Sequence, residues 1–128
     1  MDTNRTTAQK VEDMIDYAAP LIDRWPKLYK HTLGERIMDK MYQLSEICTA
    51  AELKYYKKTT LQELDIQNHT LQKLVRRAAR TEYSMRQKDG TQGKRFLLNA
   101  QHYSVWSEKI TEIGKLIGGW MKSVAERK

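Results

Sequence analysis

Metal binding or nucleophilic catalysis requires histidines, cysteines or carboxylates at defined spacings, and this sequence has few such arrangements. The three histidines, His31, His69 and His102, form no two-histidine helical pair, and the Glu-x-x-His pattern of di-metal helical bundles is missing. Cys48 falls on the apolar side of a helical pattern, which indicates a buried thiol and not a nucleophile. The sequence therefore predicts no catalytic residue, no metal site, no cofactor and no enzymatic activity.

The segment DGTQGKR, residues 89–95, superficially matches a phosphate-binding loop. Its Gly-x-x-Gly-Lys spacing lacks the four intervening residues and the Ser/Thr of a P-loop, and we expect no strand before it. We interpret the segment as a flexible basic connection with a turn at Asp89-Gly90.

Positive charge is the more informative feature of the chain. There are 23 Lys and Arg residues against 16 Asp and Glu residues, which gives a net charge of +7. Residues 73–95 hold eight cations and two acids, Glu82 and Asp89, so eight minus two places +6 of that charge in one segment. We call these cations the basic cluster: Lys73, Arg76, Arg77, Arg80, Arg86, Lys88, Lys94 and Arg95.

The spacing within the basic cluster predicts a cationic stripe along one helix, opposite Ala78 and the apolar side. At about 100° per residue, the stripe spans an arc of about 80°. Its predicted members are His69, Lys73, Arg76, Arg80, Tyr83 and Gln87. A row of cations with an aromatic side chain can neutralise phosphates and stack on a base, so nucleic acid is one candidate partner. An acidic protein surface and an ordinary solvated surface are the two other interpretations.

Helices are expected to position these residues, because apolar residues recur at helical spacing four times and strict alternation is missing. We predict helices over about residues 7–24, with a kink or a lost hydrogen bond at Pro20, over 32–55, from 60 to a frayed end near 88–93, and from 99 onward. Capping boxes at Thr32 and Thr60 and an N-cap at Asn99 mark three of the starts. Short connections favour antiparallel neighbours, so the expected fold class is all-α, an antiparallel up-down four-helix bundle, with residues 1–128 as a single domain.

Cysteine usage and hydropathy bear on the cellular compartment. A single cysteine excludes a disulfide framework, and no apolar run approaches the length of a membrane span or a signal peptide. We therefore expect a cytoplasmic protein with no membrane partner.

Two runs, YKHTLGERI at 29–37 and NAQHYSVWSEKITEIGKLIGGWMKS at 99–123, resemble a family of small bacterial four-helix bundles. The matching positions are Thr32-Leu33-Gly34, Tyr103, and Ile113-Gly114 followed by Gly119-Trp120. The family contains the accessory variability determinant (Avd) proteins of diversity-generating retroelements. It also contains proteins encoded within intervening sequences of large-subunit ribosomal RNA genes.

The resemblance implies a homopentameric barrel, encoded by a bacterium or a phage. In the retroelement branch it implies a non-enzymatic accessory protein that binds the reverse transcriptase and RNA, with DNA as a further nucleic-acid partner, and that supports mutagenic cDNA synthesis. Arg76 and Arg80 stand at the four-residue spacing of arginines in that branch. The ribosomal RNA intervening-sequence branch and a generic RNA-binding bundle remain alternatives, and an enzyme with a site formed between subunits around His102 is a third.

Three glycines, Gly114, Gly118 and Gly119, interrupt an otherwise strong helical pattern. Each costs roughly 0.5–1 kcal/mol relative to alanine inside a helix, so packing or function should offset the cost. Gly114 and Gly118 have the i, i+4 spacing of a groove that lets another helix approach, from the same bundle or from the next subunit. Trp120 continues the core seam, so these positions are predicted to serve helix packing or a subunit interface. Tolerance of glycine at an exposed position is the alternative.

Overall fold

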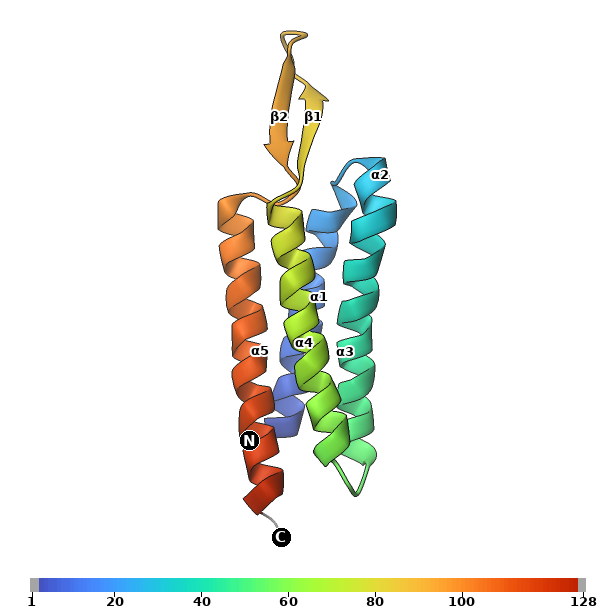
Figure 1. The fold of residues 1–128 in the computed structure, drawn as a ribbon, viewed down its shortest axis with the longest axis vertical. Coiled ribbons are helices and arrows are strands. Elements are labelled where there is room, and N and C mark those ends of the chain that lie inside the picture. The colour runs from blue at the N-terminus through green and yellow to red at the C-terminus, as the bar shows by residue number, and fades with distance from the viewer. Residues whose placement is uncertain (1–2, 127–128) are drawn as a thin grey trace.

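A computed structural model describes residues 3–126 of the chain, and four long helices make up most of it. These are α1 (Thr3–Asp23), α3 (Glu35–Leu53), α4 (Lys58–Ala79) and α5 (Ala100–Glu126). The helices run alternately up and down and lie side by side (Figure 1). The prediction of a mostly helical four-helix bundle is confirmed.

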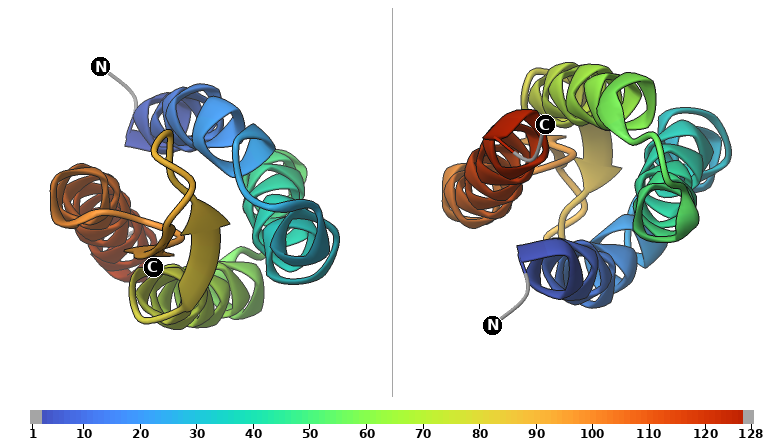
Figure 2. Two further views of the ribbon diagram at one scale, coloured as in Figure 1. Left: turned by 90° about the horizontal axis from the view of Figure 1, so that it is seen from above. Right: turned by 90° about the horizontal axis from the view of Figure 1, so that it is seen from below.

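Each long helix packs against the next one in the chain, and α5 closes the bundle against α1. Seen along its axis, the bundle surrounds a common core (Figure 2). On α5 the predicted seam is buried at Trp106, Ile110, Ile113, Ile117 and Trp120. The apolar residues of α1, α3 and α4 face the same core. Trp120 is therefore a core residue of this protomer.

The second helical stretch starts directly after Pro26, which corrects the predicted start at Thr32. The chain passes from α2 (Lys27–Tyr29) through a π-helical segment, η1 (Lys30–Gly34), directly into α3. Thr32 lies inside this continuous helical stretch, and its Oγ1 donates to the Leu28 carbonyl at 2.8 Å and caps nothing. The φ of −54° at Pro26 suits the residue before a helix, and proline restricts φ to such values.

The predicted capping box at Thr60 is also wrong, because α4 begins at Lys58 without a side-chain cap. Lys57, just before α4, instead satisfies the end of the preceding helix. Its Nζ donates to the carbonyls of Ala51 and Lys54, at 2.6 and 2.7 Å. By contrast, the predicted Asn99 cap is confirmed, since Asn99 Oδ1 accepts a hydrogen bond from His102 N at 2.7 Å. Helix α1 continues through Pro20 as one element.

A β-hairpin replaces the predicted last turns of the third long helix. Helix α4 ends at Ala79, and β1 (Glu82–Arg86) pairs antiparallel with β2 (Gln92–Phe96). The predicted turn at Asp89-Gly90 is confirmed, and Gly90 has a φ of +89°, which favours glycine. The hairpin projects beyond the end of the bundle (Figure 1). The expectation that no strand precedes residues 89–95, and that they form a flexible connection, is therefore wrong.

Candidate nucleic-acid interface

The basic cluster lies on two elements at one end of the molecule. Lys73, Arg76 and Arg77 belong to the last two turns of α4, and Arg80 immediately follows that helix. The other four members lie on the hairpin: Arg86, Lys88, Lys94 and Arg95. All eight are exposed. The single helical stripe predicted from residue 69 to residue 87 is wrong beyond Ala79, because the backbone leaves the helix there.

The charges of the basic cluster are not neutralised by close acidic partners. Within residues 6–126, the ion pairs lie elsewhere: Lys10–Glu112, Lys30–Asp23, His31–Glu35 and His69–Asp65. One of the two acids of the segment, Asp89, accepts from Thr91 N at 3.0 Å and from Thr91 Oγ1 at 2.6 Å. These hydrogen bonds lower the pKa of Asp89 and use its carboxylate to hold the turn. Within residues 6–126, no member of the basic cluster therefore forms an ion pair with an acidic side chain.

Neighbouring arginines on α4 face different grooves. Arg76 lines a groove between α4 and α5 together with Gln72, Tyr103 and Ser107. Gln72 Nε2 donates to Ser107 Oγ at 3.2 Å. Burial raises the pKa of Tyr103, but hydrogen bonds with Arg76 and Ser107 and the charge of Arg76 outweigh burial, and the net pKa is lowered. Arg76 is thus partly tethered to the protein.

Arg77 points to the other side of α4. It lines a hollow with Tyr29, His31 and Arg36, which come from the α2–α3 stretch. A helix turns by about 100° per residue, so adjacent arginines cannot share one face. The structure therefore divides the α4 part of the basic cluster between two surfaces.

The hairpin also divides its side chains between two faces. Directly opposed residues of an antiparallel pair lie on the same face, and successive residues alternate. The register pairs Tyr83 with Arg95 and Ser84 with Lys94. Arg95 and Lys94 therefore project to opposite sides of the hairpin.

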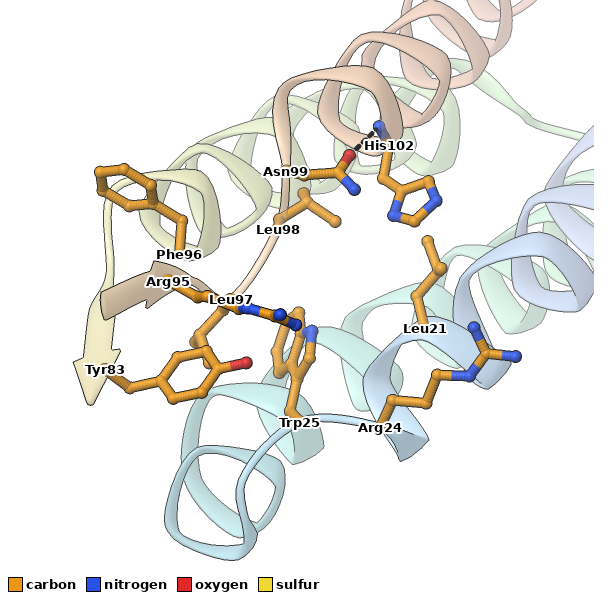
Figure 3. A pocket seen from close by; sticks show the side chains of 10 residues that line it. All are labelled: Leu21, Arg24, Trp25, Tyr83, Arg95, Phe96, Leu97, Leu98, Asn99 and His102. Carbon is orange, nitrogen blue, oxygen red and sulfur yellow. Dashed lines mark hydrogen bonds between the residues drawn. The ribbon is translucent and has the colours of Figure 1, made fainter. Parts of the chain in front are cut away.

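Arg95 and Tyr83 line a cavity of about 460 Å³ at the base of the hairpin. The end of α1 contributes Leu21, Arg24 and Trp25, and the start of α5 contributes His102. In Figure 3, the side chains of Tyr83 and Arg95 extend from the hairpin toward Trp25, and Phe96 turns away. Of the residues that line this cavity, only Arg95 belongs to the basic cluster, and only Tyr83 belongs to the predicted stripe. The cavity could have been predicted only if residues 82–96 had been recognised as a β-hairpin, and the helical interpretation of residues 80–87 prevented that.

The residues first considered for metal or thiol chemistry lie apart. Cys48 is fully buried, and burial raises the pKa of its thiol to about 12. His31 and His69 each contact a carboxylate one turn away on an exposed surface, with His31 Nδ1 at 3.2 Å from Glu35 Oε1. No group of three or more potential metal ligands occurs among residues 3–126.

Among the described residues, Gly118 and Gly119 of α5 face no other helix of the chain, whereas Gly114 lies next to Asn68 of α4. A Cβ at Gly114 would meet only Asn68 Nδ2, at 3.4 Å, whereas a Cβ at Gly118 or Gly119 would meet nothing within 4 Å. The interpretation that Gly118 serves packing within the bundle is wrong, because that side of α5 faces open space. A subunit interface at Gly114 and Gly118 stays a prediction.

The sequence of this bundle and hairpin matches a known protein family. The profile of the bAvd-like family matches residues 6–124, which include the four long helices almost completely and the whole hairpin. The chain belongs to the bAvd-like family. The predicted resemblance to Avd-like accessory variability determinant proteins is thereby confirmed. A comparison with curated proteins gives no match.

Membership in the bAvd-like family indicates the general class of protein to which the chain belongs. Avd-like proteins are accessory, non-catalytic proteins of the diversity-generating retroelement type. Within the described part of the chain, no helix is long and apolar enough to cross a membrane.

Proposed function

We propose that this protein is a non-enzymatic accessory protein of a diversity-generating retroelement, acting in the cytoplasm. It binds the reverse transcriptase and the template RNA through the basic cluster and so supports mutagenic cDNA synthesis. The observation that carries the proposal is the position, at one end of a bundle of the Avd-like family, of eight exposed cations that form no ion pair within residues 6–126.

The chemistry of the cluster suits a phosphate backbone. Five of its eight members are arginines, whose planar guanidinium groups bind phosphate oxygens in pairs. Each phosphate that a cation neutralises releases counterions, which makes the affinity depend steeply on salt. The hairpin that carries four of these cations projects beyond the end of the bundle (Figure 1), and Arg86 and Lys88 lie at its turn end, where a strand of RNA can reach them.

The division of the cluster supports two partners. Arg76 lies in the α4–α5 groove and Arg77 faces the α3 side, so one surface can contact RNA while the other contacts the polymerase. The proposed homopentamer repeats both surfaces around a closed ring, since cyclic symmetry presents identical patches in each subunit.

Replacement of Arg76, Arg77 and Arg80 by alanine tests the proposal. We expect weaker binding of single-stranded RNA, and a slope of log affinity against log salt that is shallower by ~2, because about 0.7 is lost per phosphate contact in single strands. Fluorescence anisotropy at several salt concentrations measures both quantities, and a pull-down measures binding to the reverse transcriptase. Circular dichroism and light scattering should be unchanged.

A matched control removes three exposed lysines at the opposite end of the bundle. Lys54, Lys58 and Lys122 are all exposed, and their replacement by alanine removes the same charge. If the control variant loses as much RNA affinity as the arginine variant, net charge alone explains binding and the proposed interface is wrong. If both variants keep the affinity and the slope of the wild type, the RNA-binding role is wrong.

Gene neighbourhood separates this proposal from the ribosomal RNA intervening-sequence branch. An adjacent reverse transcriptase gene with paired template and variable repeats is expected. A position inside a large-subunit ribosomal RNA gene would assign the chain to the sibling branch.

A further inference from the structure

The cavity at the base of the hairpin combines positive charge with aromatic rings. None of its ten lining residues is Asp or Glu, and the lining includes Arg24, Arg95 and His102. No ion pair involves Arg24 or Arg95 within residues 3–126. Asp23, the neighbour of Arg24 in the chain, is bound to Lys30, with Lys30 Nζ at 2.6 Å from Asp23 Oδ1. The cavity therefore favours an anionic group.

The rest of the lining favours a flat, partly apolar group. Trp25 and Tyr83 present aromatic rings, and Leu21 and Leu98 complete an apolar wall. Trp25 is only 6% exposed and Leu98 only 3%, so both are held in place by the core. Tyr83 is half-buried and reaches the cavity from the hairpin.

Polar side chains that could form hydrogen bonds with the edge of such a ligand also line the cavity. Asn99 Oδ1 accepts the hydrogen bond from His102 N that caps α5, and the amide Nδ2 of Asn99 has no hydrogen-bond partner among the described residues. The side chain of His102 is likewise free of such partners in that part of the chain, and it points into the cavity (Figure 3). Each can donate a hydrogen bond to a carbonyl or ring nitrogen.

These three properties together match one class of ligand. An inorganic anion needs no aromatic wall, and an apolar ligand needs no unpaired arginine, whereas a nucleotide needs both. The volume of about 460 Å³ lies in the usual range for small-ligand sites, roughly 300–1,000 Å³. We propose that this cavity binds one unpaired nucleotide of a single-stranded RNA.

In this arrangement the base packs against Tyr83 and Trp25, and Arg95 holds the adjoining phosphate. Tyr83 and Arg95 are directly opposed in the hairpin register, so one strand pairing delivers both contacts to the same face. Arg24 lies across the cavity from the hairpin, where it can meet the next phosphate (Figure 3). This inference rests on the proposed function and adds to it a site that recognises single strands.

The test uses a single-stranded RNA octamer with one 2-aminopurine, whose fluorescence falls when the base stacks on an aromatic ring. With the wild-type protein we expect quenching, and weaker binding of a duplex of the same sequence. Tyr83→Ala should abolish the quenching and weaken single-strand binding about 5- to 150-fold, which corresponds to the ~1–3 kcal/mol of one stacked base. Tyr83→Phe keeps the ring and should stay close to the wild type.

Two charge variants separate the cavity from the rest of the hairpin. Arg95→Gln should weaken binding and reduce quenching, since Arg95 faces the cavity. Lys94→Gln removes the same charge from the opposite face of the same strand and should leave quenching intact while it lowers affinity modestly. Quenching that survives Tyr83→Ala and Arg95→Gln overturns the inference.

The failure of this inference differs from the failure of the proposed function. If the wild type binds no RNA, the proposed function is wrong and the inference falls with it. If RNA binding depends on Arg76, Arg77 and Arg80 but duplex and single strand bind equally, only the nucleotide site is wrong. Binding of a glutamate-rich peptide that depends on Tyr83, with RNA binding independent of Tyr83, assigns the cavity to an acidic protein and also overturns the inference.

Discussion

Gly34 lies where the π-helical segment η1 packs against the end of α1. An alanine Cβ at this position would lie 2.9 Å from Ile22 Cγ2 and 3.3 Å from the Tyr29 carbonyl oxygen. Both neighbours are confined, because Ile22 is 4% exposed and the carbonyl belongs to the backbone. The Thr-Leu-Gly motif therefore serves close packing of two helices, with the glycine as its essential member.

Gly34→Ala should consequently destabilise the protein by ~1–3 kcal/mol, the usual cost of an overpacked core. Chemical denaturation followed by circular dichroism measures the change. Gly119→Ala is the matched control, since its Cβ meets nothing within 4 Å, and it should stabilise the helix by ~0.5–1 kcal/mol. A Gly34→Ala variant as stable as the wild type would show that α1 and η1 can separate without cost.

At the scale of elements, the hairpin is an appendage whose two ends meet. Leu97 N donates to the Thr81 carbonyl at 2.9 Å, so β1 leaves and β2 returns at the same point of the bundle end. Leu97 and Leu98 are buried directly after β2 and anchor the return. The buried core of the four helices contains no residue of the hairpin, although Tyr83 packs against it.

Replacement of residues 82–96 by a short Gly-Ser turn should therefore preserve the helical bundle but weaken RNA binding. Four cations are lost, and the salt slope should become shallower by up to ~3, again from about 0.7 per phosphate contact. Circular dichroism and anisotropy at several salt concentrations measure these effects. A second variant keeps the hairpin but changes its four cations to glutamine, which separates the effect of charge from the effect of shape. If RNA affinity is unchanged in both variants, the hairpin is not part of the interface.

At the scale of the whole molecule, the exposed side of α5 that carries Gly118 and Gly119 is a candidate interface between subunits. Gly118 and Gly119 stay exposed in the protomer, although each glycine lowers helix stability. Since no helix in the described part of the chain approaches them, an explanation by packing points to a second subunit. We expect a homopentamer in which another protomer covers Gly114 and Gly118.

Gly118→Leu should then disrupt the oligomer while the protomer stays folded, because a Cβ at position 118 meets none of the described residues within 4 Å. Light scattering measures the mass of the assembly, and circular dichroism measures the helix content. Gly119→Leu, one position around the helix, should disturb assembly less. A Gly118→Leu variant that assembles normally and gains stability would exclude this side of α5 from the interface, and a wild-type monomer at micromolar concentration would exclude the pentamer.

Several features could be predicted from residue patterns because they depend on contacts close in sequence. The α5 seam from Trp106 to Trp120, the buried Cys48 and the Asn99 cap follow from helical periodicity and local hydrogen bonding. The concentration of +6 in residues 73–95 is a property of composition alone. These patterns determined the fold class and the segment that carries the basic cluster.

Tertiary structure alone decided how that segment is divided. Helical periodicity favoured a longer α4 through residues 80–87, where the chain instead forms a hairpin. Whether Thr32 caps a helix or lies within one depends on Pro26 and on the fit of Gly34 against Ile22, which is a contact between elements. The cavity joins Trp25, Tyr83 and His102 from three parts of the chain. Such a meeting results from the packing of α1, the hairpin and α5, and no local spacing encodes it.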